Sequence, residues 1–311
     1  MPCNKTQHYL DPNMKKKFLL IINPISGRIQ DKAETVGQLR ETLAKHDCDL
    51  KVWETTGNKD KKKIQTLIEN EPIDAVLVGG GDGTVKMVAE VILGLDQTVG
   101  IIPLGSANGL ATSLEIGGLE EAIDAVINGE EIKMDAIWIN GELSLHLSDF
   151  GFNASLIKKF EDGGERGMLS YFKSSLAQLF DLQPFRFEIL MGDKTEKIEA
   201  KMVVIANGNK YGTGALINPV GKMDDGVFEI IALNPVGFED MVKVSIALFR
   251  GNIHEMESVK IWAASKAEIR NLDHADFQID GELLGKIDKV TIEVADQPIR
   301  FYKGKNYEAT L

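Results

Sequence analysis

The chain has 311 residues, of which 43% are hydrophobic and 26% are charged, so it is long enough for two globular domains and is neither fibrous nor disordered. Its formal net charge of -12 argues against general binding to nucleic acid, because such binding depends on neutralising phosphates with basic side chains. The two cysteines, Cys3 and Cys48, are too few for a disulfide framework or a cysteine-based zinc site.

The start of the chain shows no targeting or membrane-spanning pattern. Residues 1–14 are polar, so we expect a mobile tail, and no charged segment leads into the apolar core of a signal peptide. Nowhere do 18 apolar residues follow one another. We therefore predict a cytoplasmic protein whose contact with a membrane is peripheral.

Short apolar runs alternate with helical patterns through the first part of the chain. Strands are predicted over 18–22, 50–53, 75–78 and 99–103, and helices over 31–46, around 64–68, over 85–92 and over 119–126. Strands that alternate with helices indicate β-α-β units and a parallel sheet covered on both faces.

The pattern changes near residue 133 to short strands with few helices. Residues 134–139 and 142–147 flank Asn140-Gly141, a pair that favours a tight hairpin turn. Further strands are predicted over 185–191, 198–206, 227–233, 259–264, 277–280 and 290–294, and helices over 168–180 and 238–249. This part is typical of a mostly antiparallel β domain.

The run Gly79-Gly80-Gly81-Asp82-Gly83-Thr84 lies between a predicted buried strand and a helix. Glycines let a phosphate approach the backbone, and the free N–H groups at a helix start favour an anion. The run is neither a dinucleotide fingerprint nor a Walker loop, and alone it could be a tight turn.

Two further polar loops follow strands of the same predicted sheet. They are Asn23-Pro24-Ile25-Ser26-Gly27 and the segment from Pro103 to Asn108. Parallel strands end at the same edge, where ligands of open α/β sheets bind. Three such loops predict a ligand site.

These motifs together resemble the diacylglycerol kinase catalytic-domain family, which includes bacterial lipid kinases and sphingosine kinases. The resemblance runs from Phe18 to about Phe301 and continues in the later motifs Gly151-Phe152, Asn207-Gly208, Asp224-Asp225-Gly226 and Asp280-Gly281-Glu282. It implies an α/β nucleotide-binding domain over 15–135, outlined like that of NAD kinases, a β-sandwich for the lipid over 136–296, and a segment over 297–311 that returns to the first domain.

The resemblance also implies an ATP-dependent phosphotransferase acting on diacylglycerol or a related lipid alcohol at a membrane surface, with Mg²⁺. Glu282 would be the general base, with Asp82 and Asp280 also catalytic. A Mg²⁺ site would use Asp225 and the carbonyls of Lys222 and Val227. The nucleotide contacts would be Asn23, Ser26, Gly27, Thr55, Gly80, Gly81, Asp82, Gly83, Thr84, Ser106 and Asn108. Whether the chain forms a homodimer is left open.

Four positions depart from the family pattern, and the first is Lys86, where asparagine or histidine is common. Met87 stands where a glutamate is usual, Gly109 where many bacterial members have aspartate, and Ser106 replaces threonine. We expect the neighbouring Lys86 to be a solvated helix residue. Two alternatives stay open: a NAD kinase-like enzyme, and a catalytically weak nucleotide-binding regulator, which Met87 supports.

Overall fold

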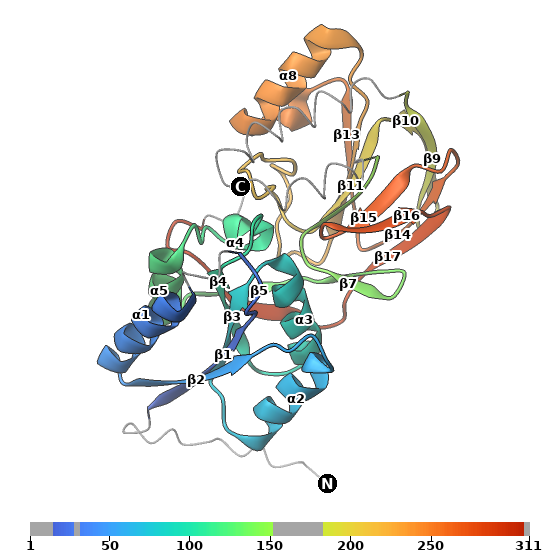
Figure 1. Cartoon of the computed structure of the whole chain (residues 1–311). Coiled ribbons are helices and arrows are strands. Elements are labelled where there is room, and N and C mark those ends of the chain that lie inside the picture. Colours follow the sequence, from blue (N-terminus) through green and yellow to red (C-terminus); the bar gives the residue numbers. More distant parts are fainter. Residues whose placement is uncertain (1–14, 28–31, 152–182, 308–311) are drawn as a thin grey trace.

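The computed structural model describes residues 15–27, 32–151 and 183–307, which form an N-terminal α/β part and a C-terminal β-sandwich (Figure 1). Within these ranges no helix is long and apolar enough to cross a membrane. The predicted tail over 1–14 and the predicted helix over 168–180 lie outside the described residues.

The N-terminal part is built on one six-stranded sheet in the order β2-β1-β3-β4-β18-β5. Its strands are β1 (Lys16–Ile22), β2 (Cys48–Glu54), β3 (Ala75–Gly80), β4 (Thr98–Pro103), β5 (Glu131–Met134) and β18 (Ile299–Tyr302). The pairs β1–β2, β1–β3 and β3–β4 are parallel. Every residue of β3 is buried, as expected for a strand covered on both faces.

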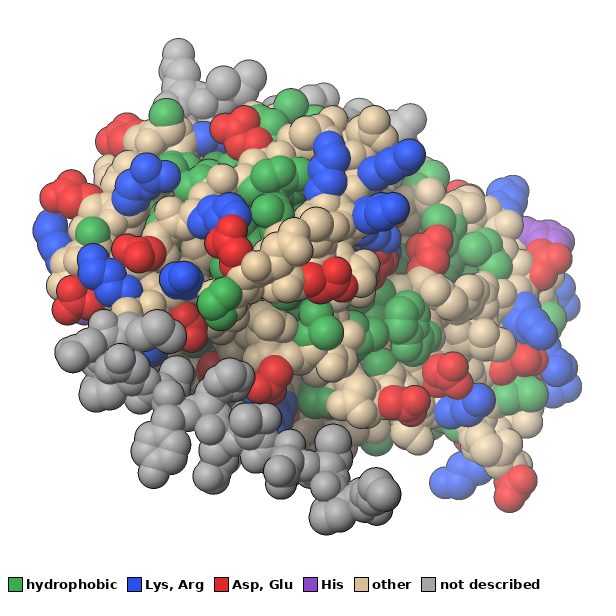
Figure 2. All heavy atoms as spheres, turned by 90° about the horizontal axis from the view of Figure 1, so that it is seen from below, with side chains coloured by type: hydrophobic (Ala, Val, Ile, Leu, Met, Phe, Trp, Pro, Cys, Tyr) green, Lys and Arg blue, Asp and Glu red, His purple; other side chains and the backbone are tan. Residues whose placement is uncertain are grey.

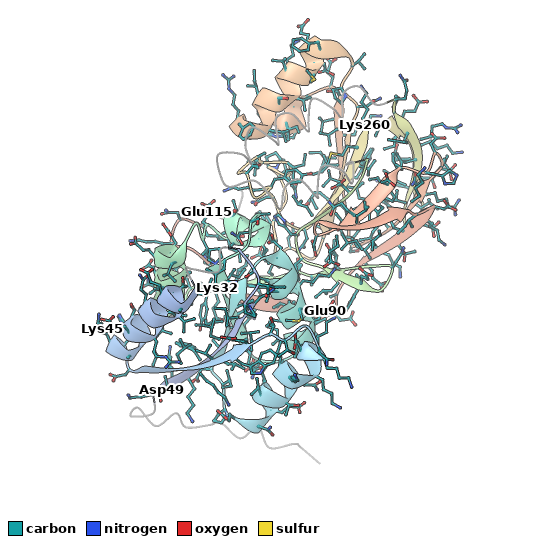
Figure 3. All side chains as sticks on the ribbon, in the orientation of Figure 1. Lys32, Lys45, Asp49, Glu90, Glu115 and Lys260 are labelled. Carbon is teal, nitrogen blue, oxygen red and sulfur yellow. The ribbon has the colours of Figure 1, made fainter. Side chains whose placement is uncertain are left out.

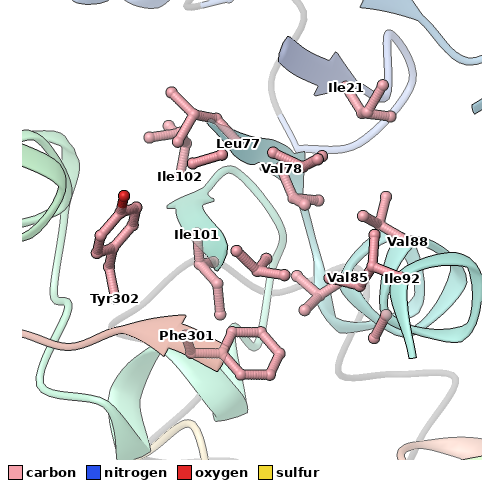
Figure 4. Close-up of a cluster of buried hydrophobic side chains, with 14 of the residues drawn as sticks. Ile21, Leu77, Val78, Val85, Val88, Ile92, Ile101, Ile102, Phe301 and Tyr302 are labelled. Atoms are coloured by element: carbon pink, nitrogen blue, oxygen red, sulfur yellow. The ribbon is translucent and has the colours of Figure 1, made fainter. Parts of the chain in front are cut away.

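Helices cover both faces of this sheet. In Figure 1, α1 (Lys32–Lys45) and α5 (Leu119–Asn128) lie on one side of the sheet, and α2 (Asp60–Asn70) and α3 (Asp82–Ile92) lie on the other. The short α4 (Gly109–Ser113) follows β4. The buried face of α3 includes Val85, Val88 and Ile92, which Figure 4 shows beside the aliphatic side chains of β3 and β4.

The strand β18 brings the chain back from the sandwich into the first sheet. It pairs parallel to β4 and antiparallel to β5. Phe301 and Tyr302 from this strand enter the same apolar cluster as Ile101 (Figure 4). Burying a side chain of this size stabilises the fold by about 2–3 kcal/mol, so β18 contributes substantially to holding the two parts together.

The C-terminal part consists of two antiparallel sheets. One has the order β10-β9-β14-β17-β6-β7 and the other β13-β12-β11-β8-β15-β16. The strands of the first are β6 (Ile137–Ile139), β7 (Glu142–Ser144), β9 (Phe185–Met191), β10 (Lys194–Ala200), β14 (Lys266–Asn271) and β17 (Lys289–Val294). Those of the second are β8 (Leu147–Phe150), β11 (Met202–Ala206), β12 (Phe228–Leu233), β13 (Val259–Ala264), β15 (Asp276–Ile279) and β16 (Glu282–Lys286).

A shared core joins the two sheets. Phe150, Phe187 and Phe277 come from three different strands, and the rings of Phe150 and Phe277 lie 4.4 Å apart between centroids. The helix α8 (Gly237–Arg250) and the 3-10 turn η2 (Ile253–Glu255) lie against the outer side of the second sheet. An α/β domain followed by a β-sandwich confirms the predicted fold class.

Three predicted strands are wrong in extent. The segment 142–147 is divided, because Ser144 ends β7 in one sheet of the sandwich and Leu147 begins β8 in the other. The segment 134–139 is divided, because Met134 ends β5 in the first sheet and Ile137 begins β6 in the sandwich. The segment 198–206 is divided at Lys201 between β10 and β11, which belong to different sheets. Lys201 donates its N–H to the Leu233 carbonyl and so leaves the β10 ladder.

Acidic and basic side chains are interspersed over the face of the molecule drawn in Figure 2. Mixed charges of this kind are ordinary for a solvent-facing surface.

Candidate active site

Three loops at the ends of β1, β3 and β4 contact one another directly. A Cβ atom added to Gly27 would lie 2.1 Å from the carbonyl oxygen of Leu104, and one added to Gly105 would lie 2.4 Å from Cα of Gly81. Backbone contact this close requires glycine. The structure thus brings together the three loops that the sequence placed at one sheet edge.

The loop after β1 is tied to the glycine run by Asn23. Its backbone N–H donates to the Gly79 carbonyl (2.9 Å), and its side-chain Nδ2 donates to Oγ1 of Thr84 (3.3 Å). Ser26 donates its hydroxyl to the Asn23 carbonyl (3.0 Å). Thr55 follows β2 and donates its N–H to Ile22, which places it beside the same loop.

The glycine run ends β3 and begins α3. Gly81 precedes the first helical residue, Asp82, and Thr84 is buried in the first turn. A Cβ on Gly80 would lie 2.6 Å from Oγ1 of Thr84, so the strand and the helix are too close for any other residue there. The positive end of the helix dipole at this turn favours a bound anion.

Asp82 binds the start of α4 with both carboxylate oxygens. Oδ2 accepts the N–H of Gly109 and Oδ1 accepts the N–H of Leu110, each at 3.0 Å. Asn108 braces the same loop, because its side chain bonds both the N–H and the carbonyl of Gly105 at 2.8 Å. These two side chains shape the loops, whereas Ser106 is exposed at the rim.

Glu282 belongs to the sandwich and lies near the glycine run. It is the first residue of β16, directly after the tight turn Asp280-Gly281, where both residues have positive φ. A Cβ placed on Gly83 would lie 3.9 Å from Oε1 of Glu282. The exposed carboxylate of Glu282 therefore lies against the first turn of α3, across the boundary between the two parts.

The Asp280 carboxylate faces protein donors. It accepts hydrogen bonds from the Ser144 hydroxyl and from the N–H groups of Leu145 and His146, each at 3.0 Å. Burial raises the pKa of Asp280, and the hydrogen bonds from Leu145 and the charge of His146 oppose that rise. With its oxygens occupied in this way, Asp280 fixes the turn that carries Glu282.

Lys86 is buried, and the expectation of a solvated residue is wrong. Its side chain is only 10% exposed, one turn beyond Asp82. Its Nζ lies 3.8 Å from Oε2 of Glu142 on β7, and its charge lowers the pKa of Asp280. The sandwich covers this face of α3, which a helical pattern read alone cannot reveal.

His146 is buried, and its ring lies 3.1 Å from the Ser113 hydroxyl. Lys210 forms an ion pair with Glu115 close by, and Figure 3 shows Glu115 at the end of the N-terminal part that faces the sandwich. Sequence reasoning gave none of these three residues a role, since their partners are far apart in the chain.

The predicted metal ligands lie in a separate acidic segment. Asp135 accepts the Gly226 N–H at 2.7 Å, and Asp225 accepts the Val227 N–H at 3.3 Å. Burial raises the pKa of Asp135, and the charges of Asp224 and Asp225 raise it further. Burial likewise raises the pKa of Glu229 to about 7.

Carboxylates grouped closely enough that Asp224 and Asp225 raise the pKa of Asp135 are oxygen donors of the kind a hard cation prefers. The segment therefore fits Mg²⁺ in its chemistry. Within the described ranges, no three His, Cys, Asp or Glu side chains are grouped to hold a metal, so a site there would depend on backbone carbonyls.

Residues 17–139 match the diacylglycerol kinase catalytic domain, and residues 149–302 match the YegS C-terminal NAD kinase beta sandwich-like domain. The chain therefore carries a diacylglycerol kinase catalytic domain followed by a YegS-type C-terminal domain. The first match ends with β6 at Ile139, the second begins within β8 at Asp149, and only short segments of the described chain lie outside the two matches.

Similar proteins agree with these matches. A protein named diacylglycerol kinase from Bacillus subtilis (strain 168) is 24% identical over 278 residues, which cover 88% of this chain and 91% of the relative. A solved structure titled as a diacylglycerol kinase from Bacillus anthracis str. Sterne has a TM-score of 0.69 at 20% identity, covering 94% of this chain and 98% of that one.

A more distant likeness in fold is to an NAD kinase from Archaeoglobus fulgidus solved in complex with ATP. Its TM-score is 0.52 at 14% identity, and the match covers 93% of this chain and 95% of that chain. The predicted outline shared with NAD kinases is thus confirmed as a similarity of fold. The domain matches imply a kinase that uses a nucleotide.

Proposed function

We propose that this protein is an ATP-dependent lipid kinase that phosphorylates a hydroxyl of diacylglycerol or a related lipid alcohol. The observation that carries the proposal is the position of Glu282, whose carboxylate comes from the sandwich and lies against Gly83 at the start of α3. Phosphoryl transfer needs the acceptor hydroxyl and the phosphate of the nucleotide to be held next to each other. A base from one domain beside a phosphate-binding turn of the other would hold two separately bound substrates in this way.

The N-terminal loops would hold the nucleotide. The first turn of α3 offers backbone N–H groups and the helix dipole to the phosphates, and the hydroxyls of Ser26, Thr55, Thr84 and Ser106 are candidate donors around it. The residues 15–135 would therefore form the nucleotide-binding domain. Asn23 and Asn108 would act by keeping the loops in place.

In the transfer step, the acceptor oxygen forms a bond to the γ-phosphorus while the bond to the leaving ADP oxygen breaks. Glu282 would accept the proton of the acceptor hydroxyl and orient that hydroxyl toward the phosphorus. Asp82 and Asp280 would position the reacting parts, because their carboxylates already bind N–H groups of the protein.

Magnesium would be held at the acidic segment by Asp225 and the carbonyls of Lys222 and Val227. When bound, it would supply positive charge that neutralises neighbouring carboxylates. Support comes from the charges of Asp225 and Asp224, which add to the effect of burial in raising the pKa of Asp135.

The acceptor would be a lipid presented by a membrane surface, with the sandwich over 136–296 as its binding domain and residues 297–311 completing the first domain. The predicted helix over 168–180 lies outside the described residues. The contact with the membrane would be peripheral.

The proposal is tested by incubating the purified chain with labelled ATP, Mg²⁺ and detergent micelles that contain one acceptor at a time. Diacylglycerol, monoacylglycerol, a sphingoid base and phosphatidylglycerol form the panel. We expect label in at least one lipid product, and no label in any of the four would contradict the proposal.

A NAD kinase-like activity is the second candidate, because the fold resembles an NAD kinase. NAD is therefore included as a fifth acceptor, and labelled NADP without labelled lipid would favour that candidate. Binding of ATP in calorimetry with no transfer to any acceptor would favour a nucleotide-binding regulator, for which Met87 is the supporting residue.

A further inference from the structure

The imidazole of His146 fills a slot between two glycines that come from the two parts of the molecule. A Cβ added to Gly109, at the start of α4, would lie 2.5 Å from Cε1 of His146. A Cβ added to Gly208, after β11, would lie 2.3 Å from Cδ2 of the same ring. The ring thus occupies the space that side chains would take at both positions.

The ring is also fixed by polar contacts from both parts. Its Nε2 lies 3.1 Å from the Ser113 hydroxyl of α4, and the ring bonds to the backbone of Lys210 in the sandwich. Burial lowers the pKa of His146, although the charges of Asp82 and Asp280 act in the opposite direction. An imidazole held on its faces and its edge is a rigid spacer.

The contacts of His146 link it to both sides of the candidate site. Its backbone N–H donates to Asp280 at 3.0 Å, and Asp280 begins the turn that presents Glu282 to Gly83. Next to Gly83, Asp82 accepts the N–H of Gly109, which touches the His146 ring. Gly109 and Gly208 leave the ring no free space, so moving the ring must move at least one of its neighbours.

We propose that His146 is a positioning residue whose ring sets the distance between the α4 loop of the nucleotide-binding domain and the Asp280–Glu282 turn of the sandwich. This role rests on the proposed function, because it concerns the alignment of Glu282 with the bound nucleotide. It differs from simple core filling, since the ring joins two domains and not two layers of one core.

The test is a double-mutant cycle between Gly109→Ala and His146→Ala. We expect either change alone to lower kcat by about tenfold or more, since misalignment of about 1 Å can cost as much as a hundredfold, while the KM for ATP stays within about twofold. The added methyl group meets the ring only when the ring is present. The double variant should therefore be no slower than His146→Ala alone.

Additive losses of kcat in the double variant would overturn the proposal, as would a His146→Ala variant whose kcat per folded molecule equals that of the wild type. His146→Gln supplies a further readout, because its amide can keep a bond to Ser113 or Lys210 and should recover part of the lost kcat. Gly37→Ala is the matched control, since a Cβ there meets nothing within 4 Å.

The wild type, the two single variants of the cycle and the double variant are also compared by thermal unfolding, which does not depend on any activity. If the wild type phosphorylates no acceptor, the proposed function fails, and coupled shifts in Tm between positions 109 and 146 still establish the slot. Additive shifts in Tm would show that the ring does not set the spacing between the two domains, whether or not the protein is a lipid kinase.

Discussion

The substitution Asp280→Asn tests how the turn before Glu282 is held. In the wild type, the carboxylate accepts one hydroxyl and two backbone N–H donors, each at 3.0 Å. An asparagine can place its oxygen where Oδ1 lies and keep two of these bonds. Its amide nitrogen then faces the N–H of Leu145, so that donor loses its acceptor.

A hydrogen bond to a charged group contributes about 1.5–3 kcal/mol, and we expect Asp280→Asn to lower the free energy of unfolding by about 2 kcal/mol. The displaced turn should also lower kcat by about 10- to 100-fold. Urea titrations and initial rates measure the two effects, with the exposed Asp288→Asn as a control. A complete loss of activity at unchanged stability would refute the positioning role, and so would wild-type values of both.

Three further predictions concern the residues around this turn. Asp82→Asn removes the acceptor of one α4 amide, so we expect stability to fall by about 1–2 kcal/mol in urea titrations and kcat to fall by at least about tenfold. Lys86→Met should lower the free energy of unfolding more than Glu142→Gln does. The reason is that the charge of Lys86 also acts on Asp280, whereas the Glu142 side chain is half exposed. Equal losses in urea titrations would contradict this. Because the pKa of His146 is lowered by burial, its contribution to stability is fully present above the ordinary value of 6.5 and is lost as pH falls below it. The Tm should therefore fall less between about pH 7 and pH 5 for His146→Gln than for the wild type, as measured by thermal melting at each pH.

The parallel sheet could be predicted because its strands are short, apolar and buried on both faces. The predicted runs over 18–22, 75–78 and 99–103 fall within β1, β3 and β4. The hairpin turn at Asn140-Gly141 is confirmed, since both residues have the positive φ that the pair favours.

The divided strands could not be predicted for a physical reason. Ala200 and Met202 are both buried, and so are Met134 and Ile137, so the apolar pattern continues while the chain passes from one sheet to another. Periodicity records that a residue is buried and does not record which core receives it.

The loops of the candidate site could be placed from the sequence because each follows its own strand directly. The environments of Lys86, His146 and Asp280 could not, because they depend on contacts such as the bond from His146 to Asp280, which joins residues 134 positions apart. A half-buried aspartate at the tip of a tight turn and a histidine between strands carry no local signal of such a partner.

The central claim is that Glu282 receives the proton of a lipid hydroxyl beside the phosphate-binding turn of α3. The most direct measurement is the initial rate of label transfer from ATP to diacylglycerol in mixed micelles, compared between the wild type and Glu282→Gln. We expect the wild type to transfer label and the variant to lose at least about 100-fold in kcat with normal folding, because only the base is removed. Transfer by Glu282→Gln at the wild-type rate would contradict the account.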